Sequence, residues 1–164
     1  MQLDHVCIAV RSIDSAIARL TRLLGYELRT ARATNSRQKV NVVFLSKPGS
    51  IDLKLIEPAS EDSPLWASLR KGEGLHHICF KADEISAKLA ELVEQGLRVL
   101  SHPAPGEAFN DHLIAFGYAG CGLNIELIDT DERRGVLERS EPESPGPNDW
   151  GSGPMSHSAP TSRS

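Results

Sequence analysis

The sequence predicts an α+β fold in which two βαβββ modules pair around a central cleft. Three observations support this fold class: an internal repeat, one amphipathic helical stripe in each repeat, and a change of composition near residue 131. An open four-stranded sheet with one helix buries only one face well, so two such units are expected to share a core. The expected parts of the chain are a first module (1–58), a linker (59–73), a second module (74–130) and a C-terminal tail (131–164).

An internal repeat relates the two halves of the chain. Four pairs of residues coincide when the sequence is shifted by 72 positions: His5 with His77, Cys7 with Cys79, Phe44 with Phe116, and Lys54 with Glu126. These pairs come from several segments of each half, yet they agree on one register. Self-similarity at a fixed offset indicates a duplicated structural unit. Both halves are therefore expected to fold alike, although the last pair exchanges a positive charge for a negative one.

The first module is expected to begin with a strand at 4–10 and to continue with a helix over 13–24. Apolar residues recur in this helix at helical spacing, Ser12 is a suitable N-cap, and Gly25 is a suitable C-cap. Runs rich in β-branched residues then predict strands at 26–33, 40–46 and 51–57.

The second module repeats this order. A strand is expected at 76–82 and a helix over 85–93, with Asp83 as N-cap and Gly96 at the C-terminal end. Further strands are expected at 98–101, 112–116 and 123–128.

The tail from residue 131 has a different composition. It is charged at first and then rich in Pro, Gly and Ser, with Trp150 as the one large apolar residue near its end. Such a segment cannot bury enough apolar surface to fold alone, so we expect a short charged extension followed by a disordered tail.

Strand alternation predicts where the polar side chains lie. Residues two positions apart in a strand point to the same face, so His5 shares a face with Cys7, and His76 points the opposite way from His77. In a pair of modules related by a pseudo-two-fold axis, equivalent residues meet across that axis. The residues expected to converge on one point in the cleft are His5, His77, Lys54 and Glu126.

Two imidazoles and one carboxylate predict a site for a divalent cation. Neutral histidine and ionised glutamate suit Fe, Mn, Co, Ni or Zn, so His5, His77 and Glu126 are candidate metal ligands. Glu126 lies in an otherwise apolar strand, where an unpaired carboxylate would be costly to bury. Either a metal ion or Lys54 is expected to neutralise it.

Charge and composition exclude other classes of function. The net charge is −4 with scattered basic residues, which argues against a nucleic-acid interface. The first residues lack the pattern of a signal peptide, and no apolar run reaches the roughly 20 residues of a membrane span. Three cysteines do not form a secreted disulfide framework, so we expect reduced thiols and a soluble cytoplasmic protein without a membrane partner.

The segments DHVCIAV and GLHHICF, with IELID closing the second module, resemble the vicinal oxygen chelate superfamily. This superfamily has the glyoxalase-like fold and includes glyoxalase I, methylmalonyl-CoA epimerase, fosfomycin and bleomycin resistance proteins and extradiol dioxygenases. The segments KVNVVFLS, KLIEPASEDSPLWASL and GEGLHHICF are most similar to methylmalonyl-CoA epimerases. The resemblance covers about residues 1–130.

The resemblance implies metal ligands at His5, His77 and Glu126, and it implies a fourth ligand, normally Glu or Gln, at the position of Lys54. An ammonium group cannot bind a metal ion. The glutamate that acts as a base in the epimerases also has no counterpart, because its neighbourhood reads Ser-Arg-Gln-Lys at 36–39. The site is therefore expected to be atypical.

Three hypotheses remain open. In the first, a divalent metal ion (Co, Zn, Mn, Ni or Fe) assists an isomerase, epimerase or lyase that forms an enolate from a carbonyl or acyl-thioester substrate. Lys54 or His112 then moves the proton, beside Glu126. In the second, Lys54 pairs with Glu126 and replaces the metal, which leaves a metal-free acid/base enzyme or a drug-sequestering binding protein. In the third, Fe(II) activates oxygen, as in the dioxygenases.

Other residues suggest the kind of partner. Arg37 and Lys39 could attract an anionic substrate such as a CoA thioester. Cys7 and Cys79 flank the candidate ligands and are expected to fill space in the core rather than to bind a soft metal. His102 and Trp66 are expected to be a loop residue and a packing residue. The fold also permits a homodimer, which we expect.

Overall fold

The structure of the protein is a computed structural model that describes residues 1–138. The strands of the first half are β1 (Gln2–Ala9), β2 (Glu27–Leu28), β3 (Ala33–Asn35), β4 (Val40–Ser46) and β5 (Asp52–Pro58). Those of the second half are β6 (Gly74–Lys81), β7 (Arg98–Pro105), β8 (Leu113–Tyr118) and β9 (Asn124–Ile128). The helices are α1 (Ile13–Leu24), α2 (Leu65–Leu69), α3 (Ile85–Glu94) and the 3-10 turn η1 (Glu107–Phe109). None of the helices in residues 1–138 has the length and apolar character needed to cross a bilayer.

The strands form one sheet with a mirrored order. The first half contributes β2-β4-β5-β1 and the second half contributes β6-β9-β8-β7, with β3 paired to β4. The halves join where β1 and β6 pair antiparallel, while β1 runs parallel to β5 and β6 runs parallel to β9. The predicted α+β fold class, with two βαβββ units, is confirmed.

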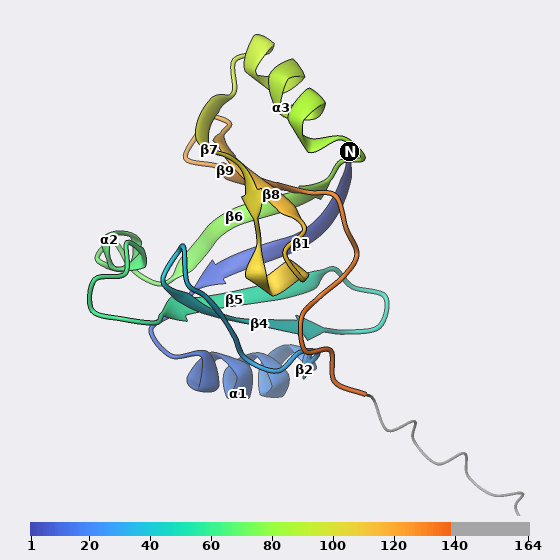
Figure 1. Cartoon of the computed structure of the whole chain (residues 1–164). Helices are drawn as coiled ribbons and strands as arrows, with labels where there is room; N and C mark the ends of the chain where they lie inside the picture. Colours follow the sequence, from blue (N-terminus) through green and yellow to red (C-terminus); the bar gives the residue numbers. More distant parts are fainter. Residues whose placement is uncertain (139–164) are drawn as a thin grey trace, which may run out of the picture.

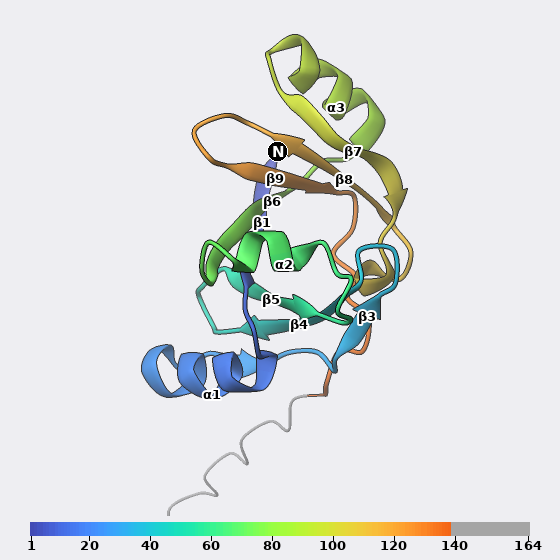
Figure 2. The same cartoon turned by 90° about the vertical axis from the view of Figure 1, so that its left-hand side faces the viewer.

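The two longer helices cover opposite ends of this sheet (Figure 1). Both views place α1 against the strands of the first half and α3 against those of the second (Figure 2). Each helix packs against the strands of its own half, and the buried side chains between them form a separate apolar cluster. A third cluster combines residues of both halves, including Cys7, Phe44, Cys79 and Phe109, and it surrounds the site described below.

Helix boundaries agree with the sequence in the first half and differ in the second. In α1 the Ser12 hydroxyl accepts a hydrogen bond from the Ser15 amide, and Gly25 ends the helix at φ 69°. The predicted cap at Asp83 is wrong, because the N-cap of α3 is Glu84 and makes no side-chain hydrogen bond. Gln95 is the C-cap, and Gly96 lies one residue beyond it.

The predicted strand at 26–33 is interrupted. Its middle is not paired as a strand, because the Thr30 hydroxyl accepts a hydrogen bond from the Phe44 amide at 3.0 Å. Thr30 also forms an isolated β-bridge with Val136 of the C-terminal extension. The extension also binds this segment through hydrogen bonds from the Ala31 amide to the Gly135 carbonyl and from the Leu137 amide to the Arg29 carbonyl. Residues 131–138 are thus part of the folded unit. The predicted disordered tail, Trp150 included, lies outside the described residues, which end at 138.

Two β-bulges at equivalent positions shape the junction between β1 and β6. The register moves from Leu3–Phe80 to His5–Cys79, which leaves Asp4 as an extra residue in β1. It moves again where β6 passes from His77 to Leu75 against consecutive residues of β1, which leaves His76 as an extra residue. A bulge breaks the alternation of side chains. For this reason the predicted opposite orientation of His76 is wrong, and its ring turns back toward His77.

Candidate functional site

Four of the predicted residues meet in the interior of the protein. Lys54 Nζ donates to both carboxylate oxygens of Glu126, at 3.0 and 2.9 Å. The Nε2 atoms of His5 and His77 each lie 3.0 Å from the same oxygen, Oε2. The four come from β5, β9, β1 and β6, whose parallel pairings place Cys7 beside Lys54 and Cys79 beside Glu126. The predicted convergence is therefore observed, while the roles assigned to these residues stay predictions.

The Lys54–Glu126 pair carries opposite charges in a sealed environment. Lys54 is 3% exposed and Glu126 is fully buried. Burial alone would raise the pKa of Glu126, but Lys54 and His77 outweigh it and hold that pKa well below its usual value. Burial would likewise lower the pKa of Lys54, but the Glu126 carboxylate raises it. Both groups are thus charged at neutral pH, which makes the pair neutral as a unit.

A chain of hydrogen bonds runs from Glu126 through His77 to His76. His77 Nε2 contacts the carboxylate, and its Nδ1 lies 2.8 Å from His76 Nδ1. Burial lowers the pKa of His77 to about 3, despite the opposing effect of Glu126, and lowers the pKa of His76 as well. Both rings are therefore neutral at neutral pH.

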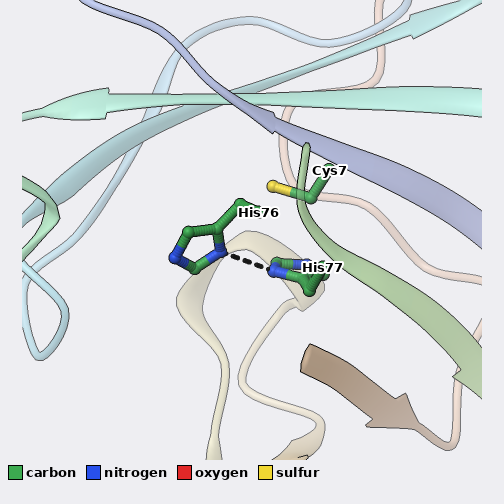
Figure 3. Close-up of side chains that lie close together, drawn as sticks. All are labelled: Cys7, His76 and His77. Carbon is green, nitrogen blue, oxygen red and sulfur yellow. Dashed lines mark hydrogen bonds between the residues drawn. The ribbon is translucent and has the colours of Figure 1, made fainter. Parts of the chain in front are cut away.

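The chain fixes the tautomers of both rings. An ionised carboxylate only accepts hydrogen bonds, so His77 must donate from Nε2 and accept at Nδ1. His76 must then donate from Nδ1, which leaves its Nε2 without a proton. That nitrogen points away from His77 (Figure 3).

His5 occupies the equivalent place in the first half and has a different neighbour. Its Nδ1 donates to Asp4 at 2.6 Å, and Arg133 binds the same carboxylate. Burial would raise the pKa of Asp4, but the bonds from His5 and the charge of Arg133 lower it overall. The Arg133 guanidinium lies 4.7 Å from the centroid of the Phe44 ring and is only 5% exposed. Arg133 of the C-terminal extension thus covers most of Asp4, whose side chain is 9% exposed.

The buried residues supply the donor set of a divalent metal site. Ligand atoms of His5, His77 and Glu126 lie within 4.8 Å of one another, so these three residues could hold a metal ion. His5 Nε2 is also buried without a hydrogen bond, although it lies 3.0 Å from Glu126. A carboxylate on Nδ1 is the usual arrangement behind a metal-binding histidine. Against this, Lys54 already occupies both oxygens of the carboxylate.

A pocket of about 340 Å³ lies beside the buried cluster. His76 is part of its wall, next to apolar side chains of both halves (Val40, Ile56, Leu65, Leu100, Phe116) and polar side chains (Arg37, Gln38, Ser68, Ser101, Asn124). His5, His77, Lys54 and Glu126 are not among the lining residues of the described part of the chain. His76 therefore connects the open pocket to the closed cluster.

The remaining candidates lie elsewhere. His112 is 39% exposed, and in residues 1–138 its ring has only two charged neighbours, Asp129 at 3.5 Å and Glu132 at 3.7 Å. It precedes β8 at a turn between Asp111 and Leu113 and is not among the pocket-lining residues of the described chain, while its predicted role in proton transfer stays a prediction. Lys39 pairs with exposed Asp62, so of the two predicted basic residues only Arg37 faces the pocket.

The two inner cysteines are fully buried, and burial raises the pKa of both thiols, as expected of packing residues. Cys7 nevertheless lies close enough to His76 and His77 that the three could form a metal-binding group (Figure 3).

The sequence did not predict that His76 and Arg133 belong to the surroundings of the buried cluster. His76 could have been suspected because it precedes a candidate ligand directly, but only the bulge turns it inward. Arg133 had no signal, because it lies in a charged segment with little apolar content.

Comparison with known proteins agrees with this architecture. The sequence profile of the Glyoxalase/Bleomycin resistance protein/Dioxygenase superfamily matches residues 4–116. The uncharacterised protein YqjC of Bacillus subtilis is 40% identical over 116 residues, or 70% of this chain and 81% of that protein. The ethylmalonyl-CoA/methylmalonyl-CoA epimerase of Cereibacter sphaeroides is 31% identical over 133 residues, or 77% and 98%. A solved methylmalonyl-CoA epimerase in complex with methylmalonyl-CoA and NH4+ has a TM-score of 0.67 at 30% identity, covering 79% of this chain and 94% of that one.

Proposed function

The chain belongs to the glyoxalase/bleomycin resistance protein/dioxygenase superfamily, and from this premise we propose that it is an isomerase or epimerase. The reaction would remove and return a proton next to the carbonyl group of a small substrate. Relatives at about 30% identity are methylmalonyl-CoA epimerases, which supports an acyl thioester as the substrate class. A lyase that uses the same enolate intermediate is the nearest variant of this function.

One observation carries the proposal: a pocket-lining histidine is the outer end of a buried His–His–Glu chain. His76 lines the pocket, His77 accepts its Nδ1 proton, and Glu126 accepts the Nε2 proton of His77. A base that is oriented by a second group, itself oriented by a third, is the usual arrangement of an activated catalytic side chain. The unprotonated Nε2 of His76 is therefore suited to accept a proton from a substrate.

The chemistry follows from this position. His76 Nε2 takes the proton from the carbon next to the carbonyl group, and the electrons of the broken C–H bond move to the carbonyl oxygen as an enolate. The imidazolium that forms is stabilised by His77 and, through it, by the Glu126 charge. Protonation of the enolate on the opposite face of the same carbon gives the epimer, and protonation at the neighbouring position gives the isomer. His76 takes the proton-moving role that the sequence assigned to Lys54 or His112.

The pocket wall supports a substrate with a polar end and an acyl chain. Arg37 carries the one formal positive charge among the lining residues of the described chain, so it is suited to a carboxylate or phosphate. Ser68, Ser101 and Asn124 offer neutral donors for a carbonyl or enolate oxygen, while the apolar wall would exclude water from it.

A metal-assisted form of this chemistry is the second candidate, and the unpartnered Nε2 of His5 favours it. His5, His77 and Glu126 would hold the ion. A divalent ion supplies Lewis acidity that polarises a carbonyl group. In this form Lys54 would have to give up its contacts with Glu126.

The test is hydrogen exchange at the substrate carbon. The protein is incubated in D2O with methylmalonyl-CoA or propionyl-CoA, and deuterium in the acyl group is followed by mass spectrometry. We expect exchange, and we expect His76→Gln to slow it by about 10²- to 10⁴-fold, the usual contribution of a general base. His102→Gln is the matched control, because this exposed histidine is not among the lining residues of the pocket in the described chain.

Two outcomes would count against the proposal. Saturable binding of acyl-CoA without any exchange would point to a binding protein of the sequestering kind. Exchange that survives in His76→Gln would place the base elsewhere.

A further inference from the structure

The position where a metal ion would bind already contains a cation. Lys54 Nζ contacts both oxygens of Glu126, at 2.9 and 3.0 Å, so the ammonium lies across the whole carboxylate. Its remaining surroundings are aromatic: Nζ lies 4.8 Å from the centroid of the Phe109 ring and 6.0 Å from that of Phe44. A carboxylate and aromatic faces together are the environment that stabilises a buried ammonium.

The contact between Lys54 and Glu126 needs no added ion. The ammonium of Lys54 and the carboxylate of Glu126 carry opposite charges and bond each other directly. A divalent ion on His5, His77 and Glu126 would bring three positive charges to one carboxylate, with the ammonium as its neighbour. An ammonium and a divalent ion that both contact the Glu126 carboxylate would repel each other strongly in an environment of low dielectric constant. The cluster as built therefore disfavours the ion, although its three ligands could bind one.

Lys54 also cannot easily move away from Glu126. The side chain is 3% exposed, and the pocket wall is formed by other residues. The two rings near the ammonium are themselves packed against His5, at 5.3 Å between centroids for Phe44 and 6.0 Å for Phe109. An ammonium displaced from Glu126 would have no second buried acceptor among its described contacts.

We infer that the Lys54 ammonium is the resident cation of this site and takes the place of a divalent metal ion, so that the His5–His77–Glu126 cluster is metal-free in the folded protein. Lys54 holds the Glu126 carboxylate in place and neutralises it on one side, as a bound metal ion would, and Glu126 stays available as the acceptor for His77. This inference concerns the composition of the buried cluster: it does not depend on the metal-free proton transfer by His76, and it rules out the metal-assisted form.

The test compares metal binding by the wild type and by Lys54→Gln. Glutamine removes the charge and offers a neutral oxygen at similar reach. Each protein is incubated with Co²⁺ or Zn²⁺ and dialysed, and bound metal is measured by mass spectrometry, with the visible absorption of Co²⁺ as a report of its ligands. We expect well under one equivalent in the wild type and close to one equivalent in Lys54→Gln. Lys39→Gln, which removes an exposed lysine paired with Asp62, is the matched control and should behave as the wild type.

Stoichiometric metal in the wild type would overturn the inference, and this measurement requires no variant to fold. A folded Lys54→Gln protein, checked by circular dichroism, that still binds no metal would overturn it as well. Because metal content is measured without a substrate, an inactive wild type that is free of metal would contradict the proposed reaction and leave this inference standing.

Discussion

The two halves of the molecule share one architecture, and around the buried cluster two pairs of equivalent residues give them different chemistry. In the first half the bulge residue is Asp4 and the closing strand carries Lys54. In the second half the bulge residue is His76 and the closing strand carries Glu126. Each bulge residue bonds the Nδ1 atom of the histidine that follows it, at 2.6 Å in the first half and 2.8 Å in the second.

We call the first half closed, because its bulge residue is mostly covered, and the second half open, because its bulge residue borders the pocket. Asp4 is covered by Arg133 of the C-terminal extension, whereas His76 lines the pocket. The duplication has therefore preserved the backbone geometry while the side chains have diverged. One bulge now supports the interior, and the other connects the interior to a ligand pocket.

The largest expected effect tests the charge pair that joins the halves. Lys54→Ala leaves Glu126 buried without its partner, and Glu126→Ala leaves the ammonium, so each change should lower the free energy of unfolding by about 3–5 kcal/mol. The double variant Lys54→Met/Glu126→Leu buries neither charge and should lose less than either single change. Urea unfolding monitored by circular dichroism measures all three. Additive losses would contradict a coupled pair.

The next effect is a dependence of stability on pH. The pKa of His77 is lowered to about 3 in the folded state, so the unfolded chain binds a proton first as the pH falls. The stability contributed by neutral His77 is complete above about pH 6.5 and is lost toward pH 3, by at most about 1.4 kcal/mol per pH unit. The lowered pKa values of Asp4 and Glu126 act in the same direction at lower pH.

The measurement is a series of urea unfolding curves between pH 7 and pH 5. His77→Gln should flatten the dependence of stability on pH in this window, with His102→Gln as the control. An unchanged slope in His77→Gln would mean that the ring is not held neutral.

A smaller effect compares the two bulges. Arg133→Ala removes the cover and one bonding partner of Asp4, whose side chain is 9% exposed, and this should lower the free energy of unfolding by about 1–3 kcal/mol. His76→Gln should change stability less, because the ring borders the pocket and an amide can still bond His77. Thermal unfolding of both variants measures the difference. The reverse ranking would contradict the division into a closed and an open half.

The smallest expected effect concerns His112. Its ring is partly exposed beside two carboxylates, so His112→Gln should change the free energy of unfolding by no more than about 0.5 kcal/mol. It should also leave acyl-CoA exchange unchanged. A large loss of exchange would restore the role in proton transfer that the sequence suggested.

The fold could be predicted from the sequence because each half of the repeat gave independent evidence for the same order of strands and helix. One register aligned both modules, and alternation along regular strands brought His5, His77, Lys54 and Glu126 together. The errors occur where the strand is irregular. His76 was assigned to the wrong face because a bulge has no sequence signature, and Arg133 was overlooked because its burial depends on contacts with residues 129 positions away.

The most direct test of the account is the protonation of the His76 and His77 rings. Long-range ¹H–¹⁵N NMR spectra of the metal-free protein at neutral pH distinguish the two tautomers of each histidine. We predict a proton on Nε2 of His77 and on Nδ1 of His76, with a bare Nε2 on His76. A proton on Nε2 of His76 would break the chain from Glu126 to the pocket and contradict the account.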